Sequence, residues 1–235
     1  MSSTTTEGIV LRTIRYSESQ LIVHLFTHQF GRISTIVRKN RKKGSSNYYQ
    51  PLFHLSFEIN YSPKKSVQRI QQVRFAAPYT NIPFSIQKST VVQFLSEILS
   101  KVIPEQEPDQ EFFNFLTNAF HLFDEEELNP QHFHLVFLLH LTRFLGVFPS
   151  GKSGKHGWFS PSEGAFVPQI MHDTIPEELS NAFEELLHTP LSGYHQLTLD
   201  RGTNQALLNQ LLDYYSIQLN VSNLKSYEVL KQVFN

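Results

Sequence analysis

The chain has 235 residues, of which 40% are hydrophobic and 17% charged, and it contains no cysteine. This length allows one large or two ordinary domains, and the apolar share suffices for a core, which excludes wholesale disorder. The lack of cysteine excludes disulfides and every Cys-ligated zinc or iron–sulfur site.

The formal charge is divided between two parts of the chain. Residues 1–79 hold twelve of the 20 Lys and Arg but only three of the 21 acids, which gives a net charge of +9. Residues 80–235 hold the remaining eight cations and eighteen acids, which gives −10. A basic block followed by an acidic block indicates that the first part binds a polyanion, and nucleic acid is the commonest such partner.

Five short segments rich in Ile, Val and Thr predict strands, at residues 8–15, 20–27, 32–37, 52–61 and 67–75. The second is apolar at nearly every position, which is typical of a central strand, and Gly31 is expected at the tight turn after it. The fourth alternates apolar and polar residues, so one of its faces should be buried. Five strands in so short a stretch favour a small barrel, for which the OB-fold is the natural candidate.

The apolar spacing becomes helical beyond residue 78. It predicts helices at residues 85–103, 112–123, 129–146, 176–188, 203–220 and 223–234, with Asn129 as an N-cap and Gly146 at a helix end. Residues 147–175 hold four Gly and three Pro, which indicates a loop or short hairpin. The predicted class is α+β, with a five-stranded OB-fold barrel at residues 1–79 and an all-α helical domain at residues 80–235.

The densest chemical signal is a basic run between the third and fourth strands. Its cations suit phosphate contact, and two tyrosines behind it could stack on unpaired bases. Because the surrounding barrel is basic too, three further arginines join the candidate DNA-binding set. The set is Arg12, Arg15, Arg32, Arg38, Lys39, Arg41, Lys42, Lys43, Tyr48 and Tyr49. The alternative interpretation of the run is a solvated, mobile loop.

No pattern in the sequence indicates catalysis or a bound cofactor. The paired acids, such as Glu184 and Glu185, lie at expected helix ends or polar faces, where a solvated role is the simpler interpretation. His132 and His134 are two positions apart on an expected helix, so they point in different directions and do not chelate one ion. No HExxH, GxGxxG, Walker A or GxSxG motif occurs. We therefore expect no catalytic residue, metal site or cofactor.

Three segments of the sequence resemble the RecO family of recombination mediators. They are residues 7–12 (EGIVLR), residues 16–19 (YSES) with 26–32 (FTHQFGR), and residues 137–146 (FLLHLTRFLG). The basic run stands where that family has its Arg/Lys-rich segment. The resemblance covers essentially the whole chain, and the first third is the most specific part.

This resemblance implies an N-terminal OB-fold, a helical C-terminal domain and no bond-breaking reaction. It implies binding and annealing of single- and double-stranded DNA, and partnership with RecR. It also implies contact with the acidic, Phe-ending tail of single-strand-binding protein, and through these partners the loading of RecA onto gapped DNA. Many family members carry four cysteines after the Gly-ended helix. Here that place has none, so the zinc site is not transferred and aromatic packing should hold the loop.

A peptide site in the helical domain follows as a hypothesis. A C-terminal Phe requires an apolar pocket and a nearby cation, which Arg143, Phe144 and Phe148 could supply. The alternative is that Arg143 pairs with an acid such as Glu97 and only stabilises the helices.

The expected location is the bacterial cytoplasm, in association with the nucleoid. Residues 1–7 are too polar for a signal peptide, and the longest apolar run, residues 135–148, is too short to span a bilayer. The rival function for the whole chain is a protein-interaction scaffold whose basic barrel binds an acidic protein.

Overall fold

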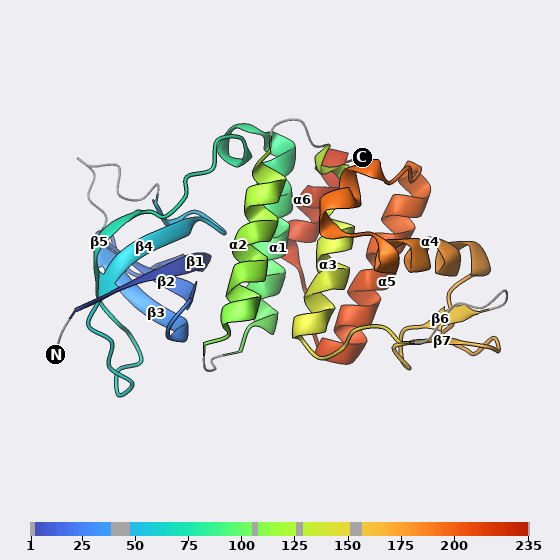
Figure 1. Cartoon of the computed structure of the whole chain (residues 1–235), viewed down its shortest axis with the longest axis horizontal. Coiled ribbons are helices and arrows are strands. Elements are labelled where there is room, and N and C mark those ends of the chain that lie inside the picture. The colour runs from blue at the N-terminus through green and yellow to red at the C-terminus, as the bar shows by residue number, and fades with distance from the viewer. Residues whose placement is uncertain (1–2, 39–47, 105–107, 126–128, 151–156, 235) are drawn as a thin grey trace. The chain divides into compact units, whose positions relative to one another are not determined.

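The computed structural model describes residues 3–38, 48–104, 108–125, 129–150 and 157–234. The chain forms two compact units, Met1–Glu126 and Glu127–Asn235. In Figure 1 the first is coloured blue to green and the second yellow to red.

The first unit contains a five-stranded antiparallel sheet with the order β3-β2-β1-β4-β5. Thr35, on the edge strand β3, forms a bridge with Gln68 just before β5, so the two edges of the sheet approach each other and the sheet curls into a half-open barrel. This confirms the predicted barrel. Its strands are β1 (Thr4–Arg15), β2 (Gln20–Thr27), β3 (Gly31–Arg38), β4 (His54–Ile59) and β5 (Ile70–Phe75).

Alternation of apolar residues explains why these segments pair as strands. Leu21, Val23 and Leu25 on β2, with Ile33 and Val37 on β3, fill the barrel interior. β2 is an inner strand, as predicted, but the middle strand of the sheet is β1. The turn between β2 and β3 requires a left-handed backbone, which Gly31 supplies with φ of 63°.

The prediction that β4 buries only one face is wrong. His54 and Ser56, on the face expected to be polar and exposed, are 7% and 6% exposed. For His54 the cause is tertiary, because helix α2 packs against its ring. The His54 ring meets the rings of Phe113 and His121 on α2, at 5.8 and 5.9 Å between centroids.

Two helices complete the first unit, α1 (Ile86–Val102) and α2 (Gln110–Asp124), after a short 3-10 turn, η2 (Ile82–Phe84). A β-bulge at Leu11 interrupts the ladder between β1 and β2. The hydroxyls of Ser96 and Ser100 on α1 donate to the Leu11 carbonyl at 2.6 and 3.0 Å. The compact unit thus extends beyond residue 79, and the domain boundary placed there remains a prediction.

The second unit is helical, apart from one small hairpin. Its helices are α3 (Phe133–Phe144), α4 (Glu177–His188), α5 (Arg201–Leu219) and α6 (Lys225–Phe234), with 3-10 turns η3 (Pro130–His132) and η4 (Leu191–Gln196). The hairpin pairs β6 (Trp158–Ser160) with β7 (Ala165–Val167). The helix predicted from residue 129 therefore begins as a 3-10 turn, which Asn129 caps.

Gly146 ends α3 as predicted. It has φ of 73°, and the next N–H, of Val147, bonds back to the Thr142 carbonyl at 3.0 Å. This is the Schellman arrangement that favours glycine. The α3 side chains are apolar around nearly the whole helix and are buried, so α3 is the core of this unit.

The β6–β7 hairpin confirms the predicted aromatic packing. The Phe159 ring stacks on Phe183 at 4.2 Å and meets Phe166 and Tyr214 at 5.4 and 5.6 Å. The hydroxyl of Ser160 and the N–H of Ser162 donate to the Asp173 carboxylate, each at 2.9 Å. Rings and hydrogen bonds thus fix this segment.

Candidate nucleic-acid interface

The exterior of β1, β2 and β3 forms a continuous surface, which we call the outer face. Cross-strand partners project to the same side of a sheet, and residues between them project to the other. Since Leu21, Val23 and Leu25 fill the interior, their neighbours and the partners of those neighbours project outward. The outer face comprises Arg12, Ile14, Gln20, Ile22, His24, Ser34, Ile36 and Arg38.

The outer face carries an apolar row between two cationic rows. Ile14, Ile22 and Ile36 are partners in register, and all three are partly or largely accessible. Arg12 lies in the row on one side and Arg38 in the row on the other, and both are exposed. Guanidinium groups beside accessible apolar surface suit a strand that presents phosphates and base faces together.

Arg15 is exposed at the end of β1, next to Tyr16, which is 63% exposed. Among the residues that the structure describes, no carboxylate pairs with Arg12, Arg15 or Arg38. Of the four described arginines that were predicted to bind DNA, three therefore lie at the surface and have no described ion-pair partner.

Arg32 differs from the other predicted arginines. One guanidinium nitrogen donates to the carbonyls of Ser100 and Ile103, at 3.0 and 2.5 Å. These carbonyls lie at the C-terminal end of α1, where a cation is favoured by the helix dipole. This arginine therefore holds α1 on the barrel, a role that the sequence analysis did not foresee.

The two tyrosines behind the basic run do not both reach the surface. Tyr49 is 8% exposed and belongs to the barrel core, where burial raises its pKa to about 12. Tyr48 is half-buried, and its ring packs on Phe75 at 4.7 Å. The hypothesis that Tyr49 stacks on bases is thus opposed by its position, since the barrel interior already covers its ring.

Most of the basic run itself, Lys39, Arg41, Lys42 and Lys43, lies outside the described residues. The residues on either side of this undescribed part, Arg38 and Tyr48, are described. Arg38 ends β3 on the outer face, and Tyr48 follows on the barrel.

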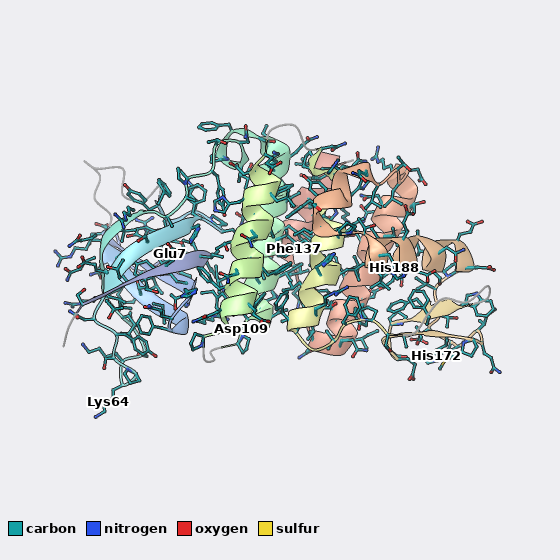
Figure 2. All side chains as sticks on the ribbon, viewed as in Figure 1. Glu7, Lys64, Asp109, Phe137, His172 and His188 are labelled. Atoms are coloured by element: carbon teal, nitrogen blue, oxygen red, sulfur yellow. The ribbon has the colours of Figure 1, made fainter. Side chains whose placement is uncertain are left out.

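A groove next to this face holds residues that the sequence analysis did not single out. It has a volume of about 1170 Å³ and lies between the β2–β3 turn and the β4–β5 loop. Phe30 and Tyr61 stack in it, with ring centroids 4.4 Å apart, and Lys64 and Lys65 line it. Lys64 projects from the loop in Figure 2. The motif Tyr61-Ser62-Pro63-Lys64-Lys65 could have indicated it, since an aromatic residue and two cations share one turn.

In the second unit, Arg143 and Phe148 lie together. The guanidinium carbon of Arg143 is 4.1 Å from the centroid of the Phe148 ring, within the range of a cation–π contact. Phe148 is 37% exposed, Arg143 is exposed and Phe144 is half-buried. Among the described residues of this unit, no carboxylate pairs with Arg143.

The described histidines do not converge on a metal-binding arrangement. No group of three or more His, Asp or Glu side chains suited to a metal ion occurs among the described residues. His54 bonds to Glu7 at 2.9 Å, His132 to Asn204 at 2.9 Å and His140 to the Thr189 carbonyl at 2.9 Å. Each of these three therefore has a structural partner. Within the same ranges, no helix is long and apolar enough to cross a membrane.

Fold and surface together define the class of protein: an α+β chain with a basic OB-type barrel first and a helical unit second. Comparison with known families agrees. The model described as "Recombination protein O N terminal" matches residues 1–79, and "Recombination protein O C terminal" matches residues 83–228.

Similar proteins extend over nearly the same length. The chain is 36% identical over 235 residues to the "DNA repair protein RecO" of Flavobacterium psychrophilum. It is 31% identical to the proteins of that name from Phocaeicola vulgatus and Bacteroides fragilis, over 245 and 238 residues. Each match covers 98% of both chains. The chain belongs to the RecO family of DNA repair proteins, as its sequence motifs suggested.

Proposed function

We propose that this protein is a recombination mediator that binds and anneals DNA and helps to load RecA onto gaps coated with single-strand-binding protein. The observation on which the proposal depends is the outer face, where Arg12 and Arg38 flank an accessible apolar row. Neither arginine has an ion-pair partner among the described residues. Membership of a DNA repair family supports it.

Annealing requires no acid–base or nucleophilic group, so the proposal includes no catalytic residue. Two DNA strands repel each other, and cations that neutralise phosphates lower that repulsion. Surfaces that contact base faces hold the bases unpaired and accessible. The outer face has both features, and Arg15 adds a cation at its end.

The proposed partners are RecR, the acidic tail of single-strand-binding protein and, indirectly, RecA, in the bacterial cytoplasm at the nucleoid. The tail would contact Arg143, Phe144 and Phe148. The cation–π contact of Arg143 with Phe148 holds the guanidinium group beside an exposed ring, so a carboxylate and an apolar side chain could both be bound there.

A protein-interaction scaffold is the second candidate, because a net charge of +9 over residues 1–79 attracts any polyanion, including an acidic protein. The two functions differ in their response to DNA. An arbitrary single-stranded oligonucleotide should displace a ligand from a DNA site but should not displace a protein bound through a specific interface.

The experiment is a gel-shift titration of the whole chain with single-stranded and double-stranded DNA at two salt concentrations. We expect binding of both forms, weakened by salt, and acceleration of strand annealing in a fluorescence assay. An Arg12→Ala, Arg38→Ala double variant should bind DNA more weakly. The slope of log affinity against log salt should become shallower by the equivalent of about one phosphate contact for each arginine. Absence of DNA binding by the folded wild-type protein would overturn the proposal.

A further inference from the structure

The groove between the β2–β3 turn and the β4–β5 loop is built from one rigid wall and one aromatic pair. The rigid wall is the β4–β5 loop, which Gln68 fixes. The Gln68 side chain, which is 3% exposed, accepts from the Ser62 N–H at 3.1 Å and donates to the carbonyls of Ser62 and Lys65, at 2.9 and 2.7 Å. Its backbone N–H donates to the Ser34 carbonyl at 2.8 Å. The loop is thus tied both to itself and to the edge of β3.

This fixed loop presents two exposed cations, Lys64 and Lys65, on the groove. Among the described residues neither lysine is in an ion pair. Among the described residues that line the groove there is one acid, Asp109, and its carboxylate accepts from the Phe112 N–H at 2.9 Å as the N-cap of α2. That charge is offset in part by the helix terminus, so the groove favours an anion.

The aromatic pair gives the groove a second kind of binding surface. Phe30 packs against the barrel core, and Tyr61 stacks on it with an interplanar angle of 21°. Tyr61 is 36% exposed, so its ring is held in place from one side and accessible from the other. A ring that is already fixed loses little rotamer freedom when a ligand stacks on it.

We propose that this groove binds unpaired nucleotides, with a base stacked on Tyr61 and phosphates on Lys64 and Lys65. The inference rests on the proposed function and adds a preference for single strands to it. Base faces are accessible only in unpaired nucleotides, whereas phosphates are accessible in a duplex as well. Ser34, which lines the groove, belongs to the outer face, so one strand could continue from one surface to the other.

The test compares three variants of the full chain on an unstructured single strand and on a blunt duplex. Tyr61→Ala should weaken single-strand binding about 5- to 140-fold, the range that corresponds to the stacking of one base, and should leave duplex binding unchanged. Tyr61→Phe keeps the ring and is the matched control, with wild-type affinity. The double variant Lys64→Ala, Lys65→Ala should lower the single-strand salt slope by about 1.4.

Two outcomes would overturn the groove without affecting the proposed function. Wild-type single-strand affinity in a Tyr61→Ala protein with an unchanged melting temperature would show that no base stacks there. Equal loss on single strands and duplex, from the lysine variant alone, would show a cationic surface that binds any anion, including an acidic protein. If the wild-type protein bound no DNA, the proposed function and the groove would fail together.

Discussion

His134 lies in the core of the second unit, on the buried helix α3. Burial, and to a smaller extent the nearby His132, lower the pKa of His134 from 6.5 to about 3. The folded state therefore holds this imidazole neutral, whereas the unfolded chain takes up a proton near pH 6.5.

We expect the stability of the protein to fall as the pH drops below about 6.5. In this range the unfolded state binds more protons, and the cost for one such group approaches ~1.4 kcal/mol per pH unit. Above pH 7 the contribution of His134 to the free energy of unfolding does not change with pH. Urea unfolding at pH 7.5 and 5.5 measures it. His134→Leu should flatten the dependence, while His172→Leu, at an exposed position, should keep it; an unchanged slope in His134→Leu would contradict the assignment.

Arg143 is the residue on which the peptide hypothesis depends. Arg143→Ala should weaken binding of an acidic, Phe-terminated peptide by about 1–3 kcal/mol, because a charge-assisted hydrogen bond and the cation beside Phe148 are both lost. Isothermal calorimetry measures this, and DNA binding should be unchanged. Arg201→Ala, an exposed arginine of the same unit, is the control. Tight peptide binding by a folded Arg143→Ala protein would place the site elsewhere.

For single residues, the sequence indicated which side chains could bind DNA but not which of them remain accessible in the fold. Arg12, Arg15 and Arg38 lie at the surface as a DNA-binding role requires, but Arg32 is engaged by helix carbonyls and Tyr49 by the core. A single basic or aromatic residue in a strand does not reveal which neighbours cover it. That depends on elements far along the chain, here α1 for Arg32.

At the scale of elements, the basic run of residues 38–43 is the segment whose charges should contribute most to DNA affinity. Replacing Arg38, Lys39, Arg41, Lys42 and Lys43 with Ala should flatten the log–log salt slope by roughly 4 units on duplex and about 3 on single strands, if all five contact phosphates. The fold should persist, because the sequence predicts a loop for this run and loops add little to a core. Fluorescence anisotropy over a salt series measures the slope, and circular dichroism verifies folding. Unchanged DNA affinity and an unchanged salt slope would exclude the basic run from the interface.

Element type was predictable because periodicity is local. The five strands and the main helices follow from apolar spacing, and Gly146 and Asn129 mark ends through their own backbone preferences. The burial of both faces of β4 was not predictable in this way. On its polar side, His54 is covered by α2, which lies more than fifty residues further along. Only a tertiary contact of this kind reverses an alternating pattern.

For the whole molecule, we expect metal to be irrelevant. The chain has no cysteine, and no described cluster of His, Asp or Glu suits an ion. EDTA should leave the melting temperature and DNA affinity unchanged. Stoichiometric zinc in protein purified without an affinity tag, measured by elemental analysis, would contradict this expectation. His156, which lies outside the described residues, and His172 would be the first ligands to examine.

The division of charge was the most useful whole-chain signal, because it separates a basic barrel from an acidic helical part without any structural knowledge. It could not locate the groove at Tyr61. That site depends on Gln68 folding the β4–β5 loop back onto β3, and a hydrogen-bonded tie of this kind leaves no periodic pattern in a sequence.

The hairpin of β6 and β7 has a consequence for redox chemistry. Stacked phenylalanines and the Asp173 carboxylate hold it, and none of these groups is a thiol that peroxide could convert to a sulfenic acid or a disulfide. A hairpin held by zinc thiolates would release its metal when oxidised. Peroxide also damages DNA, so we expect the packing of this hairpin to persist under oxidative conditions that damage DNA.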